Sequence, residues 1–272
     1  MYTEFYGLKE NPFNVTSDPS YLFMSRHHKE AYAHLLYGIK QRKGFIEITG
    51  EIGAGKTTLC RALLREISDN IKTALILNPS LSEFQLLQSI LEDLGLSVEG
   101  KNKFNLLKTL NDFLIKELTH GNNVVIIIDE AQNLTGKLLE QIRLLSNLET
   151  EKEKLIQIIL VGQPQLKKRL LHEDLTQLRQ RIAIRYHILP LDKDEIRDYI
   201  HHRLTVAGCN KTITFTDSAI DQIYSYTLGT PRLINVVCDK ALLTGFVEGT
   251  TYFNGDIINK ATEEIEGRVV AK

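Results

Sequence analysis

The chain has 272 residues, of which 43% are hydrophobic and 25% charged, as is ordinary for a globular protein with one large domain or a large and a small one. Its formal net charge of −1 argues against bulk attraction to nucleic acid, although a local basic patch stays open. No apolar run approaches the ~18 residues of a membrane span, so we expect no direct membrane insertion.

The first segment, residues 1–24, mixes aromatic residues with turn formers and does not read as a signal peptide. We expect it to form an ordered, extended arm that lies on a domain. Ser25 follows as a possible cap for a helix over residues 26–41. The histidines of this helix lack clear metal-ligand spacing, so we expect them to be solvated or core residues. They are His27, His28 and His34.

The next stretch, residues 50–57, fits G-x-x-x-x-G-K-[ST], the phosphate-binding loop of nucleotide hydrolases. It lies between a predicted strand, residues 45–49, and a predicted helix, residues 58–67, which is the context that the motif requires. Lys56 is expected to reach the β- and γ-phosphates, and the Thr57 hydroxyl to bind Mg²⁺. The residues expected to contact ATP here are Gly50, Glu51, Ile52, Gly53, Ala54, Gly55, Lys56, Thr57 and Thr58.

Strands and helices alternate from the loop to residue 190. The further predicted strands are residues 73–77, 124–128, 155–161 and 182–188. The predicted helices are residues 82–95, 102–118, 135–148 and 165–180. Continuous aliphatic runs indicate strands that are buried on both faces, as in a parallel sheet covered by helices. This alternation predicts a doubly wound α/β domain over residues 1–190.

The pattern changes beyond Pro190. Helix signals begin near Asp192, Phe215, Thr230 and Asn254, and the only strand signal is a short edge at residues 212–215. We therefore expect residues 191–272 to form a small, all-helical lid domain.

Two acids end the aliphatic strand 124–128. Asp129 should lie at the carboxyl edge of the sheet, where open α/β sheets bind ligands, and can hold Mg²⁺. Glu130 follows directly and can orient or deprotonate the attacking water. Together with the phosphate loop, these residues predict hydrolysis of the γ-phosphate of ATP.

Such hydrolysis also needs a cation for the charge that develops on the γ-oxygens, and the planar guanidinium of arginine suits this role. The candidates are Arg179, Arg181 and Arg185 around the fifth predicted strand, and Arg232 at the start of a C-terminal helix. Surface ion pairs remain an open alternative for each of them, and we favour function for Arg181 and Arg232.

Several motifs, taken together, resemble one family. They are the phosphate loop and the segments at residues 5–8, 11–13, 127–134, 160–164, 177–182 and 229–235. The chain is similar over nearly its whole length to the ExeA/GspA-like secretion ATPases of the AAA+ class. Residues 142–148 and 199–204 look most like the subgroup associated with exosortase (PEP-CTERM) and exopolysaccharide loci.

The resemblance implies an AAA+ fold with a five-stranded parallel sheet and a helical lid, and a homo-oligomeric ring such as a hexamer. It implies Gln163 near the sensor-1 position, where many AAA+ proteins have Asn or Thr. Arg181 would be the arginine finger offered to a neighbouring subunit, Arg232 the sensor-2 residue, and Phe13 part of a segment near the adenine. It also implies a cytoplasmic protein that acts at the inner membrane through a membrane-protein partner.

Two alternatives stay open. One is a DNA-dependent ATPase of the transposition-helper kind, supported by a basic stretch over residues 167–185 but weakened by Glu173 and Asp174, which interrupt it. The other is a nucleotide-dependent scaffold that hydrolyses slowly.

Overall fold

The computed structural model describes residues 2–151 and 153–267, which form two compact units. The sheet unit comprises Lys29–Ile52 and Leu59–Ile188, and the helical unit comprises the described residues of Met1–His28, Gly53–Thr58 and Leu189–Lys272. Residues 1, 152 and 268–272 of the two predicted domains lie outside the described residues.

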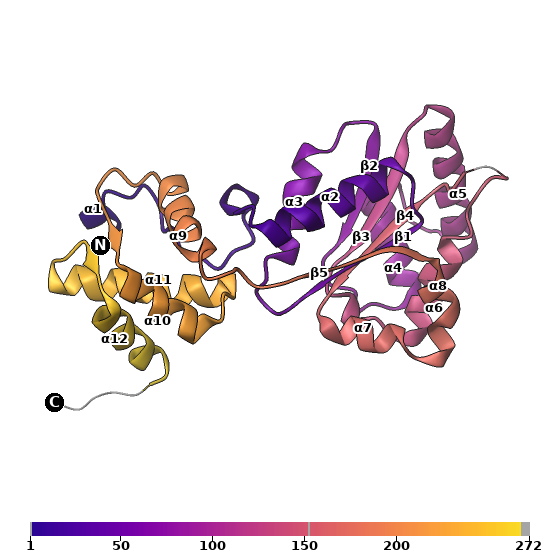
Figure 1. The fold of residues 1–272 in the computed structure, drawn as a ribbon. Coiled ribbons are helices and arrows are strands. Elements are labelled where there is room, and N and C mark those ends of the chain that lie inside the picture. Colours follow the sequence, from indigo (N-terminus) through magenta and orange to yellow (C-terminus); the bar gives the residue numbers. More distant parts are fainter. Residues whose placement is uncertain (1, 152, 268–272) are drawn as a thin grey trace. The chain divides into compact units, whose positions relative to one another are not determined.

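The sheet unit is built on a five-stranded parallel sheet in the order β2-β3-β4-β1-β5 (Figure 1). Its strands are β1 (Phe45–Gly50), β2 (Ile71–Ile76), β3 (Asn123–Ile128), β4 (Gln157–Gly162) and β5 (Ile182–Ile188). All five predicted strands are thus confirmed, with ends that differ by at most two residues.

Helices cover both faces of this sheet, because every residue of the three central strands, β3, β4 and β1, is buried. The helices are α2 (Arg26–Lys40), α3 (Lys56–Glu66), α4 (Glu83–Asp93), α5 (Lys103–Thr119), α6 (Gly136–Leu145), α7 (Pro164–Leu170) and α8 (Thr176–Arg181), with short 3-10 turns at Ala131–Asn133 and Glu173–Leu175. The first residues of α2 and α3 belong to the helical unit.

The parallel register brings the carboxyl ends of three neighbouring strands to one edge. Thr49 of β1 pairs with Gly162 of β4, and Leu160 of β4 pairs with Ile128 of β3. The segments that follow these strands therefore start side by side: the phosphate loop after β1, Asp129 after β3 and Gln163 after β4.

One predicted helix is wrong. Residues 165–180 do not form a continuous helix but break into α7, a 3-10 turn and α8. Leu166, Leu170, Leu175 and Leu178 are all buried, and the five-residue step from Leu170 to Leu175 does not fit the helical period. The break at residues 171–175 lets Leu175 return to the core.

The helical unit contains α1 (Tyr2–Tyr6), α9 (Glu195–Val206), α10 (Asp217–Thr227), α11 (Pro231–Glu248) and α12 (Gly255–Ile265). It is not wholly helical, because β6 (Thr214–Phe215) pairs with β7 (Tyr252–Phe253) in a small parallel sheet. The rings of Phe215 and Phe253 stack with centroids 4.8 Å apart. β6 lies within the short edge predicted at residues 212–215, whereas β7 was not predicted, because two residues are too few to give a periodic sequence signal.

The N-terminal segment differs from the expected arm. It begins with a helix, α1, and contains a 3-10 turn at Pro19–Tyr21. Tyr6 is fully buried in the core of the helical unit, and its hydroxyl donates to the carbonyl of Leu242 at 3.0 Å. The segment thus packs among the helices of the helical unit. None of the helices in the described part of the chain combines the length and apolarity that a membrane crossing needs.

Candidate nucleotide site

The phosphate loop joins the carboxyl end of β1 to the first residue of α3. Gly53 and Gly55 have φ angles of +79° and +85°, in the left-handed region that glycine adopts without strain. Lys56 is 6% exposed although it carries a charge. A loop of this conformation turns backbone N–H groups toward one centre, and α3 adds the positive end of its dipole, as an anion site requires.

Arg232 meets this loop through its backbone, within the helical unit. Its N–H donates to the carbonyl oxygen of Gly53 at 3.3 Å. A Cβ atom added at Gly53 would lie 2.5 Å from the Cβ of Arg232, so only glycine fits at this approach. Arg232 is exposed, and the backbone that carries its side chain is held against the phosphate loop.

The candidate acidic residues lie after β3, in the sheet unit. Asp129 is 2% exposed, its N–H donates to the carbonyl of Ile76 at 2.8 Å, and one of its carboxylate oxygens accepts the N–H of Glu130 at 2.8 Å. Glu130 has left-handed backbone angles, φ 51° and ψ 34°, which are uncommon outside glycine. Strain of this kind is typical of functional positions.

Two side-chain amides hold the carboxylate of Glu130. Gln132 and Gln163 each donate from Nε2 to Oε2 of Glu130, the latter at 3.2 Å. Gln132 also accepts the backbone N–H of Gln163 at 2.9 Å, which ties the segment after β3 to the segment after β4. The structure therefore brings Glu130 and Gln163 together, and it adds Gln132, which the sequence analysis did not select.

Phe13 is 2% exposed and belongs to the core of the helical unit. Its two neighbours are held by the buried guanidinium of Arg203, whose Nε donates to Pro12 O at 2.5 Å and whose Nη2 donates to Asn14 O at 3.0 Å. Because the ring of Phe13 faces the core, a contact between this segment and adenine would have to use groups other than this ring.

The arginines near β5 differ in their surroundings. Arg181 is exposed and its Nη1 donates to Ser146 Oγ at 3.1 Å and Asn147 Oδ1 at 2.5 Å. These partners come from the end of α6 and not from the segment of Asp129 and Glu130 after β3. Arg185 instead pairs with the buried carboxylate of Glu47 at 3.2 Å, which favours a structural role for it.

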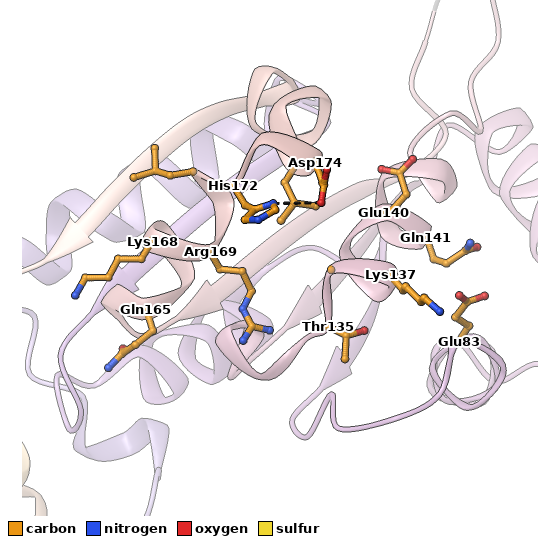
Figure 2. A pocket seen from close by; sticks show the side chains of 13 residues that line it. Glu83, Thr135, Lys137, Glu140, Gln141, Gln165, Lys168, Arg169, His172 and Asp174 are labelled. Carbon is orange, nitrogen blue, oxygen red and sulfur yellow. Dashed lines mark ion pairs between the residues drawn. The ribbon is translucent and has the colours of Figure 1, made fainter.

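A groove of about 1210 Å³ lies elsewhere on the sheet unit, between the start of α6 and the segment from α7 to residue 175 (Figure 2). Thr135, Lys137 and Glu140 line one side of it, and Lys168 and His172 the other. None of the predicted site residues lines this groove, so it is not the predicted nucleotide site.

Known proteins share this sequence and fold. A family model described as an AAA domain matches residues 39–170. General secretion pathway protein A of Aeromonas hydrophila is 44% identical over 268 residues, which cover 98% of this chain and 49% of that protein. The chain thus spans about half the length of this curated relative.

Solved structures show the same fold. The Aeropyrum pernix ORC2 protein, in ADPNP-ADP complexes, matches with a TM-score of 0.69 at 19% identity, covering 97% of this chain and 75% of that one. Cdc6p of Pyrobaculum aerophilum matches with a TM-score of 0.67 at 16% identity, covering 91% and 71%. The RuvB Holliday junction branch migration motor of Thermotoga maritima gives 0.52 at 18% identity, covering 87% and 68%.

These identities are low enough that the structural matches establish the fold alone, whereas the match to general secretion pathway protein A extends along almost the whole sequence. The chain is accordingly an AAA domain protein with an α/β AAA+ fold and a C-terminal helical region, and it is homologous to general secretion pathway protein A.

Proposed function

We propose that this protein binds ATP with Mg²⁺ and hydrolyses it to drive or switch a step of bacterial envelope secretion. The observation that carries the proposal is the carboxylate of Glu130, which two amides hold at the sheet edge from which the phosphate loop starts. A fixed carboxylate at the sheet edge from which a phosphate loop starts fits the needs of water-mediated phosphoryl transfer.

In the proposed reaction, a water oxygen attacks the γ-phosphorus while the bond from that phosphorus to the β–γ bridging oxygen breaks. Glu130 orients the water and accepts its proton. Lys56 and the N–H groups of the loop bind the phosphate oxygens, and Arg232 and Gln163 sense the γ-phosphate. Gly50–Thr58 and the backbone near Phe13 bind the rest of the nucleotide.

The residues proposed for Mg²⁺ fit its chemistry. The Thr57 hydroxyl and the Asp129 carboxylate offer oxygen atoms, the donors that Mg²⁺ prefers. The N–H of Glu130 occupies one lone pair of Asp129 and fixes the orientation of that carboxylate. When bound, Mg²⁺ would neutralise charge on the β- and γ-phosphates.

Calorimetry with ATP, with and without EDTA, tests the proposal together with a measurement of phosphate release. We expect ATP to bind, binding to weaken in EDTA, and phosphate release to require Mg²⁺. A folded protein that shows no heat of ATP binding at any usable concentration would refute the function.

We further propose that Arg181 acts across subunits in a homo-oligomeric ring. Support comes from its exposed guanidinium, which Ser146 and Asn147 hold in a defined orientation. Mixing an Arg181→Ala variant with a Glu130→Gln variant tests this sharing. Mixed rings should recover activity above either variant alone, because some interfaces then combine an intact Arg181 with an intact Glu130.

The partner is proposed to be an inner-membrane protein, because the homologous protein is named for a general secretion pathway. The exosortase and exopolysaccharide subgroup rests only on the resemblance of residues 142–148 and 199–204. Membrane fractionation tests the partner: the Glu130→Gln variant with ATP should sediment with inner membranes and be released in nucleotide-free buffer.

The DNA-dependent alternative gains little from the structure. Arg169 and Arg185 of the basic stretch are each engaged with protein oxygens. A filter-binding titration over salt concentration decides it, since a strand-binding groove must bind DNA at low salt and release it as salt rises.

A further inference from the structure

His28 lies at the start of α2 and is only 3% exposed, and it contacts the phosphate loop within the helical unit. Its Nε2 is 3.0 Å from the carbonyl oxygen of Ala54. On the other side of the ring, Nδ1 is 2.7 Å from the hydroxyl of Ser25. The imidazole therefore bridges the segment before α2 and the middle of the loop.

These partners define the tautomer of the ring. A carbonyl oxygen can only accept, so Nε2 carries a proton and donates it to Ala54. Burial lowers the pKa of His28, which favours the neutral ring, so that Nδ1 accepts the proton of the Ser25 hydroxyl. Ser25 also accepts the backbone N–H of His28 at 3.3 Å, which fixes the orientation of the ring.

The carbonyl of Ala54 shares a peptide unit with the N–H of Gly55. Because a trans peptide is planar, its C=O and N–H point in opposite directions. A donor that fixes the carbonyl of Ala54 therefore aims the N–H of Gly55 away from His28. Arg232 does the same for the preceding peptide, since its N–H binds the carbonyl of Gly53, whose peptide partner is the N–H of Ala54.

Close packing supports this reading. A Cβ atom added at Gly55 would lie 2.9 Å from Nε2 of His28, just as one added at Gly53 would lie 2.5 Å from Arg232. Each left-handed glycine of the loop thus makes room for a donor that comes from a distant part of the sequence. His28 and Arg232 therefore hold two peptides of the loop by their carbonyl oxygens. The N–H groups of these peptides, those of Gly55 and Ala54, point away from the two residues.

We propose that His28 is a positioning residue of the nucleotide site, which holds the peptide between Ala54 and Gly55 so that its N–H is presented to a phosphate of ATP. The inference rests on the proposed function, because it names what sets the affinity of that site. A core histidine without this role would affect only the stability of the fold.

The test compares His28→Leu with His28→Gln. Leucine fills the space but cannot donate, whereas the side-chain amide of glutamine can place an N–H near the position of Nε2. We expect leucine to weaken ATP binding about tenfold, the effect of one lost hydrogen bond in an ordered loop, and glutamine to stay within about threefold of the wild type. The matched control is His34→Leu, an exposed histidine of the same helix, which should bind ATP as the wild type does.

Calorimetry gives the affinities, thermal unfolding by circular dichroism checks the fold, and steady-state kinetics separates KM from kcat. The KM for ATP should rise about tenfold in His28→Leu, whereas kcat should change less than about threefold, because Glu130 is untouched. A folded His28→Leu protein with wild-type affinity, or equal losses in the leucine and glutamine variants, would overturn the inference.

If the His28→Leu variant does not fold, the Ser25→Ala variant tests the inference instead. It removes only the hydroxyl that orients the ring of His28. It should weaken ATP binding about threefold, and an unchanged affinity would again overturn the inference. If the wild-type protein bound no ATP, the proposed function itself would be wrong. This result is distinct from any result obtained with the variants.

Discussion

The phosphate loop and the acidic cluster of Asp129, Glu130, Gln132 and Gln163 are held in different ways. Two left-handed glycines, Gly53 and Gly55, shape the loop, and its Gly53 and Ala54 carbonyls are bound by the Arg232 N–H and by the His28 ring. Side-chain amides shape the acidic cluster, where Gln132 and Gln163 hold the carboxylate of Glu130. This difference suggests a division of labour, in which changes around the loop alter ATP affinity and changes in the cluster alter turnover.

The largest effect should come from Glu130→Gln. The amide keeps the shape of the side chain but cannot accept a proton, so turnover should fall by about 10² to 10⁴. The affinity for ATP should stay within a few-fold of the wild type, since the loop is unchanged. Phosphate release and calorimetry measure the two quantities, and an unchanged rate would remove Glu130 from its proposed role.

The converse variant is Lys56→Ala. Its buried ammonium is proposed to contact the β- and γ-phosphates, and charge-assisted hydrogen bonds of this kind contribute about 1.5–3 kcal/mol each. The affinity for ATP should therefore fall by roughly a factor of 10². Lys29→Ala, at an exposed lysine outside the loop, is the matched control and should bind normally. An unchanged affinity for ATP in the Lys56→Ala variant would contradict the proposal that the phosphate loop determines ATP affinity.

The sequence predicted part of each region and missed part of each. The phosphate loop was predictable because its conformation depends on a short contiguous motif, and the strands were predictable because aliphatic runs indicate burial on both faces. Asp129 and Glu130 followed from their position at a strand end. Their roles, like those of Arg181 and Arg232, stay predictions.

The sequence analysis did not select His28 and Gln132, because Ala54 and Gln163, which they bind, lie far away in the sequence. Nothing in the local pattern of α2 distinguishes a histidine that binds a loop carbonyl from one that fills the core. Gln132 has a weak signal, an amide two residues after the acid, but its contact with Gln163 depends on β4 lying beside β3. The break between α7 and α8 did have a signal, the five-residue step from Leu170 to Leu175.

The Gln132→Ala variant tests whether the acidic cluster controls turnover and leaves ATP affinity unchanged. It removes one amide that holds Glu130 and the acceptor for the N–H of Gln163. We expect turnover to fall about tenfold with ATP affinity unchanged, because a net hydrogen bond is worth about 1 kcal/mol and the carboxylate becomes less well oriented. Asn133→Ala, an exposed amide in the same 3-10 turn, should leave both quantities unchanged. Equal effects at the two positions would mean that the turn as a whole, and not the amide, supports Glu130.

The smallest effect should come from Arg185→Ala, outside both regions. Burial raises the pKa of Glu47 on β1, whereas Arg185 and, more weakly, Lys167 lower it. Without Arg185 the pKa of Glu47 in the folded state rises further above its unfolded value. A carboxyl of this kind favours folding below its unfolded pKa, and the benefit is lost as the pH rises through the folded pKa.

The Arg185→Ala variant should therefore lose about 1 kcal/mol of unfolding free energy at pH 7, a modest amount because the Arg185 side chain is 47% exposed, and less near pH 5. Urea unfolding at the two pH values measures this loss. Adding Glu47→Gln should recover most of it, because a neutral amide needs no cation. ATP affinity and turnover should stay as in the wild type. If either fell tenfold, the ion pair between Arg185 and Glu47 would belong to the site. Arg185 would then be a candidate, like Arg181, for the cation that stabilises the γ-phosphate.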